Sequence, residues 1–119
     1  MLVPNNPRLT MAIGLCFWLV ACASPQAARE KGAVATYTSA KAARVVTDCV
    51  ASAWENAYGG TTPVNVRPLA GGYSLQISVG GNTQVLLDVT DVDGGSMSKY
   101  YKGNVMIEGR LDSAVQRCQ

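Results

Sequence analysis

Three pairs of adjacent glycines in the second half of the chain most constrain its fold. They are Gly71-Gly72, Gly80-Gly81 and Gly94-Gly95, and they mark off segments of strand length. Within two of these segments apolar residues alternate with polar ones, as Tyr73, Leu75, Ile77 and Val79, and then as Val85, Leu87 and Val89. This period is typical of an antiparallel sheet with one buried and one solvated face. The pattern predicts strands joined by tight hairpins.

Two further segments extend this predicted sheet. The segment TPVNVRP, residues 62–68, is expected to be an edge strand because its prolines cannot donate to a central ladder. The segment SMSKYYKG, residues 96–103, is the fourth candidate strand. Its Lys99 and Lys102 would discourage pairing at the opposite edge. The expected sheet is therefore a four-stranded antiparallel meander.

Helical spacing appears on both sides of these strands. After Ser39, a possible N-cap, apolar residues recur on one stripe, and Gly59-Gly60 provides a stop. The stripe consists of Ala42, Val46, Cys49, Val50, Ala53, Trp54 and Ala57. A second stripe closes the chain and consists of Leu111, Ala114, Val115 and Cys118. The sequence thus predicts an α+β two-layer sandwich of order α-β-β-β-β-α, with both helices on one face of the sheet.

The N-terminal segment has the build of a signal peptide. Residues 11–21 form an uncharged run of about 11 residues, which is shorter than the roughly 20 residues of a membrane-spanning helix. Arg8 and the amino terminus supply a positive region before this run. A transmembrane helix is the weaker interpretation.

The end of this run, Leu19-Val20-Ala21-Cys22, resembles the lipobox of bacterial lipoproteins. The resemblance covers about the first 22 residues and implies attachment of diacylglycerol to Cys22, cleavage before it, and acylation of the new amino terminus. The alternative is an ordinary signal peptide cut after Ala21 or Ala23. By analogy with enterobacterial lipoproteins, Ala23 favours the outer membrane, with the domain facing the periplasm.

Cleavage before Cys22 would also decide which cysteines remain in the mature protein and where its segments begin. Cys16 would leave with the signal peptide, residues 1–21, and Cys22 would carry the lipid. Cys49 and Cys118 then remain in an oxidising compartment, where we expect one disulfide between the two helices rather than two buried thiols. A disulfide that closes a loop of about 70 residues stabilises the folded protein by roughly 4 kcal/mol. Residues 22–38 have no sustained apolar period and are expected to be a flexible tether to the domain, residues 39–119.

Little in the sequence points to catalysis or to a cofactor. The chain has no histidine, and no nucleophile or phosphate-binding motif occurs. Asp88, Asp91 and Asp93 are weak candidates for a calcium site, but their spacing does not fit an EF-hand. A solvated turn is the simpler interpretation of these aspartates. We therefore expect no enzyme, no metal and no cofactor.

A tyrosine pair flanked by lysines offers a possible interaction surface. Tyr100 and Tyr101 must point to opposite faces of any strand that they share. One of them would lie on the open side of the sheet near Lys99 or Lys102, a composition common in binding surfaces. The alternative is an exposed tyrosine that packs only on its neighbours.

Three functional classes follow, in order of preference. The first is a noncatalytic envelope lipoprotein, membrane-bound through its lipid, that docks a protein partner through a sheet face or edge. The second is a small-ligand or cell-wall binding module, which requires a concave pocket. The third is a cell-wall hydrolase. A formal net charge of +2 predicts no nucleic-acid partner and no strong electrostatic binding of the whole chain to a membrane surface.

Overall fold

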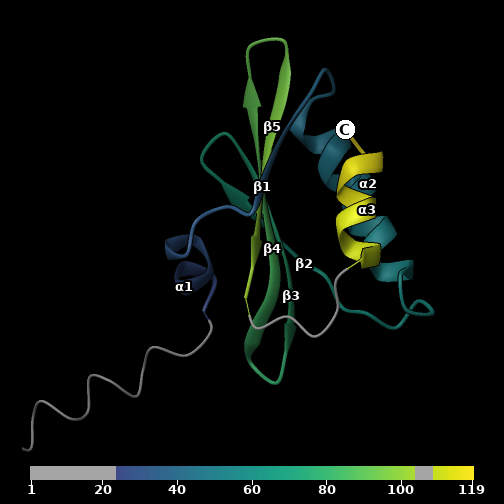
Figure 1. Cartoon of the computed structure of the whole chain (residues 1–119). Coiled ribbons are helices and arrows are strands. Elements are labelled where there is room, and N and C mark those ends of the chain that lie inside the picture. The colour runs from purple at the N-terminus through teal and green to yellow at the C-terminus, as the bar shows by residue number, and fades with distance from the viewer. Residues whose placement is uncertain (1–23, 104–108) are drawn as a thin grey trace, which may run out of the picture.

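A five-stranded antiparallel sheet, in the order β1-β5-β4-β3-β2, forms the middle of the molecule (Figure 1). The structure, a computed structural model, describes residues 24–103 and 109–119. Its elements are α1 (Pro25–Glu30), β1 (Ala35–Ser39), α2 (Ala43–Asn56), β2 (Asn65–Leu69), β3 (Gly72–Val79), β4 (Asn82–Val92), β5 (Gly95–Lys102) and α3 (Gly109–Arg117). The α+β class predicted from the sequence is confirmed.

β3 and β4 follow the predicted alternation, except that Val79, beyond a register shift at the end of β3, is 57% exposed. Leu75 of β3 lies opposite Leu87 of β4, and both are fully buried. Gly80 and Gly81 connect these strands with φ angles of 58° and 78°, which a glycine adopts without the steric cost that a side chain would bring. The glycine pair thus closes the hairpin, and the alternating apolar side chains of both strands meet on one face, whereas Leu86 lies on the other.

The sheet has one strand more than the predicted four. β1, with the sequence ATYTS, pairs antiparallel with β5 and begins in the segment 22–38 that was expected to be a flexible tether. That expectation is wrong for both β1 and α1. β5 is consequently an inner strand, so Lys99 and Lys102 do not protect an edge. β1 has only one large apolar residue, Tyr37, so its sequence shows no clear alternation, whereas the free side of β5 supplies the partner that a strand needs.

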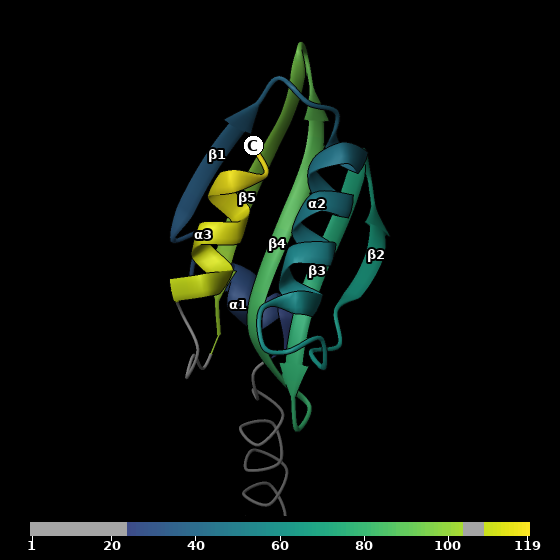
Figure 2. The ribbon, with the colours of Figure 1, turned by 90° about the vertical axis from the view of Figure 1, so that its right-hand side faces the viewer.

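The helices also differ from the predicted order. α2 and α3 cover one face of the sheet as expected (Figure 2), but α1 lies on the opposite face (Figure 1). The order is therefore α-β-α-β-β-β-β-α. α1 has only six residues, too few to show an apolar stripe. Its local signals are Ser24, whose side chain accepts from the Ala27 N–H, and a proline in its first turn.

The start of α2 shows how the sheet and helices fit together. The predicted N-cap, Ser39, is the last residue of β1, and α2 begins four residues later with Ala42 as its N-cap. Ala42 has no capping side chain, and instead the Ala43 N–H donates to Asp91 Oδ1 of β4 at 2.8 Å. A carboxylate from the sheet thus satisfies a helix-terminal amide that the local sequence leaves without a cap.

The main core lies between the sheet and the α2–α3 layer. The Trp54 indole is fully buried there and its Nε1–H donates to the Leu111 carbonyl at 3.1 Å. The buried residues of this core are Ala43, Val46, Val50, Trp54, Leu75, Ile77, Val85, Leu87, Val89, Tyr100, Leu111, Ala114, Val115 and Cys118. A much smaller cluster, Ala28, Leu86 and Tyr101, lies under α1 on the other face.

Candidate interaction surfaces

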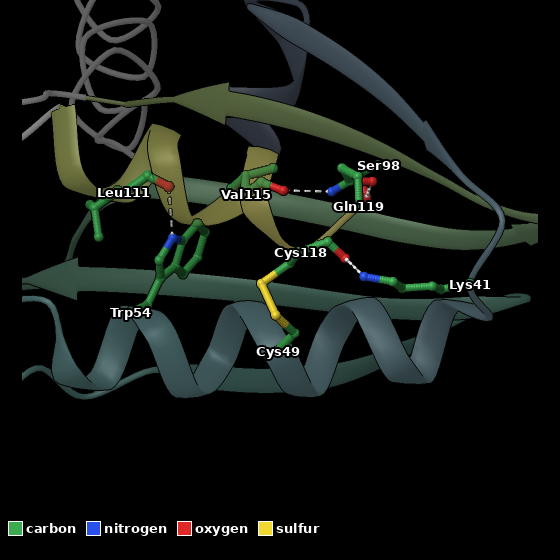
Figure 3. The surroundings of a disulfide bond; sticks show 8 residues. All are labelled: Lys41, Cys49, Trp54, Ser98, Leu111, Val115, Cys118 and Gln119. Carbon is green, nitrogen blue, oxygen red and sulfur yellow. Dashed lines mark hydrogen bonds between the residues drawn. A yellow bond between two sulfur atoms is a disulfide. The ribbon is translucent and has the colours of Figure 1, made fainter.

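A disulfide between Cys49 and Cys118 joins α2 to the residue after α3 (Figure 3). The two Cα atoms lie 5.7 Å apart, and 69 positions separate the cysteines in the chain. Lys41 reaches the same place, where its ammonium donates to the Cys118 carbonyl at 3.3 Å. The predicted pairing is confirmed, while Cys22 lies outside the described residues.

The three aspartates considered as a weak calcium site lie in three different surroundings. Asp88 accepts hydrogen bonds from Arg29 of α1, and Asp91 accepts from the first amide of α2 on the opposite face. Asp93 is exposed beyond the end of β4. No group of three metal-ligating side chains occurs among residues 24–103 and 109–119. The structure does not bring these carboxylates together.

The predicted surface of Lys99, Tyr100, Tyr101 and Lys102 is divided between the two faces of β5. Tyr100 is 1% exposed in the main core, with its ring centroid 6.3 Å from that of Trp54. Tyr101 is 8% exposed under α1. The Lys102 ammonium lies 3.2 Å from an Asp112 carboxylate oxygen, whereas Lys99 is exposed. Because neither tyrosine is accessible, these residues do not form one binding surface.

An ion pair that the sequence did not predict attaches α1 to the sheet. The Arg29 guanidinium donates through Nε and Nη2 to the two oxygens of Asp88, at 2.8 and 2.9 Å, and through Nη2 to Ser74 Oγ at 3.1 Å. The hydrogen bond to Asp88 raises the pKa of Arg29. Burial, followed by the charge of Asp88, raises the pKa of Tyr101. Arg29 and Asp88 lie 59 positions apart, so the spacing of neighbouring residues in the sequence could not reveal this ion pair.

The two edge strands differ in whether they can accept another strand. β2, NVRPL, carries Arg67 and Pro68, and proline and charge both discourage pairing at an edge. β1, ATYTS, has neither. Thr36 and Thr38 are exposed, and Val34, just before the strand, is 57% exposed. β1 therefore lacks the two features that discourage pairing at β2.

The described surface has hollows near the helices. One of them, about 700 Å³, is an open groove between α2 and α3, lined by Ala53, Asn56, Ala57, Gly109, Arg110, Ser113 and Arg117. An apolar hollow between the end of the sheet and the segment after α2 has only about 210 Å³. Small-molecule sites usually have about 300 to 1,000 Å³. The volume of the apolar hollow is thus too small for a typical ligand. The volume of the groove lies within the usual range, but the groove is open to solvent.

No protein-family model matches the chain, and no curated protein or solved structure is significantly similar to it. Within the part of the chain that the structure describes, no helix is both long and apolar enough to span a bilayer.

Proposed function

We propose that this protein is a noncatalytic lipoprotein of the bacterial envelope that binds a protein partner by strand addition at β1. The lipobox Leu19-Val20-Ala21-Cys22 supports the anchor. The Cys49–Cys118 disulfide supports an oxidising compartment, which in bacteria lies outside the cytoplasm. Attachment by two or more acyl chains would hold the domain at the membrane permanently, most simply at the periplasmic side of the outer membrane.

The difference between the two sheet edges carries the interaction part of this proposal. An edge strand presents unpaired amides and carbonyls, and a partner segment can satisfy them by continuing the ladder. β1 leaves this possibility open, whereas β2 opposes it through Pro68 and Arg67. Thr36 lies across from Lys99 on one sheet face, and Tyr37 across from Ser98 on the other. The expected partner is an extended segment without proline.

Photocrosslinking in cells tests the interaction at this edge. A photoreactive residue at Thr36 of β1 should capture one specific envelope protein, and the same residue at Asn65 of β2 should capture none. Thr36→Lys combined with Thr38→Lys should abolish capture from a crosslinker at Val34, because charge on an edge strand opposes pairing. The matched variant Asn65→Lys should leave that capture unchanged. Equal capture from both edges would contradict strand addition at β1.

A ligand-binding lipoprotein is the second candidate, favoured by the groove between α2 and α3. Arg110 and Arg117 are the charged residues among its lining, and guanidinium groups bind carboxylates well. Carboxylate-bearing cell-wall peptides would fit this chemistry. Sedimentation of the purified protein with isolated peptidoglycan tests this alternative, and binding lost in Arg110→Gln, Arg117→Gln would favour it over strand addition.

A further inference from the structure

The first residue that the structure describes, Ser24, lies two positions after the proposed lipid attachment point, Cys22. Only Ala23 separates Cys22 from Ser24, whose side chain caps α1. An extended chain advances at most about 3.6 Å per residue, so the Cα atoms of Cys22 and Ser24 can be no more than roughly 7 Å apart. A lipidated Cys22 would thus hold the start of α1 within a short distance of the bilayer surface.

α1 is in turn attached to the sheet. Ala28 is 3% exposed and packs in a cluster with Leu86 of β4 and Tyr101 of β5. Arg29 adds the paired hydrogen bonds to Asp88 and the contact with Ser74. Because α1 is held by apolar packing and by an ion pair, the short link to the lipid restrains the whole sheet and not α1 alone.

The sheet face that carries α1 has a basic row across its strands. Arg67, Ser74, Asp88 and Lys99 are successive cross-strand partners, from β2 through β3 and β4 to β5. Directly opposed residues share a face, and Arg29 contacts Ser74 and Asp88, so this row lies on the α1 side. Arg29 neutralises Asp88, which leaves Arg67 and Lys99 flanking the pair as positive charges.

We propose that the α1-bearing face of the sheet lies against the membrane and binds anionic phospholipid headgroups through Arg67, Lys99 and Lys31, the exposed C-cap residue of α1. The exposed Glu30 beside Lys31 is the opposing charge on this helix. This inference rests on the proposed lipid anchor. The short link places this face near the bilayer, and its charge complements an anionic surface, where each basic side chain contributes favourably. α2 and α3, on the opposite face (Figure 1), then point away from the membrane, and the β1 edge lies along it.

Lysine acylation of the mature lipoprotein in vesicles tests this orientation. The lysines beyond Cys22 are Lys31, Lys41, Lys99 and Lys102. The protein is reconstituted in vesicles of phosphatidylethanolamine and phosphatidylglycerol and treated with a membrane-impermeant amine reagent, and labelling of each lysine is measured by peptide mass spectrometry. The comparison is a variant with about 20 Gly and Ser residues inserted between Ala23 and Ser24, a linker that reaches roughly 25 Å as a random coil.

The expected result is several-fold slower labelling of Lys31 and Lys99 in the native protein than in the linker variant. Lys41, which contacts the Cys118 carbonyl on the other side of the sheet, should react equally in both and serves as the internal control. Exchange of phosphatidylglycerol for phosphatidylcholine should reduce the protection. Protection that is indifferent to this exchange would overturn the role of headgroup charge.

Flotation of the same vesicles separates the two proposals. Protein that floats with the vesicles, yet shows equal labelling of Lys99 with and without the linker, overturns the orientation while the anchor stands. Protein that does not float and carries no acyl group on Cys22 overturns the anchor and the orientation together.

Discussion

The two faces of the sheet are stabilised in different ways. Between the sheet and the α2–α3 layer lies the main core, closed by the disulfide between Cys49 and Cys118. The other face has one six-residue helix, a cluster of three buried residues, and the ion pair of Arg29 with Asp88. Apolar burial and chain cross-linking on the first face are the large stabilising contributions. We infer that this face determines the fold, while the second face determines how the N-terminus is held.

Loss of the disulfide should lower the stability of the protein more than any other change considered below. Replacing Cys49 and Cys118 together by alanine removes the cross-link over 69 positions and should lower the free energy of unfolding by about 4 kcal/mol. Urea denaturation of the variant measures the loss, and reduced native protein is the matched control. A loss below about 1 kcal/mol would mean that the α2–α3 face does not depend on its cross-link.

Removal of the ion pair under α1 should have a smaller effect. Arg29→Gln leaves the Asp88 carboxylate, 13% exposed in its side chain, without its charged partner, and should cost about 1 to 2 kcal/mol, reduced by the partial solvent contact of Arg29. Double replacement with Asp88→Asn should recover part of that loss, since no charge then remains desolvated. A loss as large as that of the disulfide variant would erase the distinction between the faces.

The carboxylate that caps α2 should contribute about as much as an ordinary helix cap. Asp91→Ala leaves the Ala43 N–H without the acceptor found at 2.8 Å and should lower stability by about 1 kcal/mol. Asp93→Ala, at an exposed position beyond β4, is the control and should change stability little. Equal effects of the two substitutions would contradict the capping role.

The smallest effect concerns alkaline pH. Burial raises the pKa of Tyr101 in the folded protein above the unfolded value of about 10. Its contribution to stability is therefore complete below the unfolded pKa and is lost as pH rises through the folded pKa, because the unfolded state releases its proton first. Tyr101→Phe should show a smaller decrease in urea midpoint between about pH 9 and pH 11. An identical decrease would contradict this assignment.

Sequence periodicity predicted the main-core face well and the α1 face poorly. Alternating residues such as Leu75 and Leu87 revealed β3 and β4, and the stripe containing Val46 and Trp54 revealed α2, because each element contributes enough apolar residues to show a period. β1 contributes one large apolar residue, Tyr37, and α1 has only six residues, so neither shows a period. Their placement depends on the free side of β5 and on the contact of Arg29 with Asp88, both of which join distant parts of the chain.

The predicted candidate site failed for a related reason. Opposite directions for Tyr100 and Tyr101 were expected from strand geometry, and the structure confirms them. The sequence could not show that α1 covers the second face, and so both rings are buried. The edge at β1 became a candidate only when the strand order was known.

Intact-mass spectrometry of the protein extracted from bacterial membranes tests both the lipid anchor and the disulfide. We expect a chain that begins at Cys22, carries diacylglycerol and an amino-terminal acyl group, and gains the mass of two hydrogen atoms on reduction of Cys49–Cys118. A mature chain that begins elsewhere, or an unmodified Cys22, would contradict the membrane anchor and with it the proposed function.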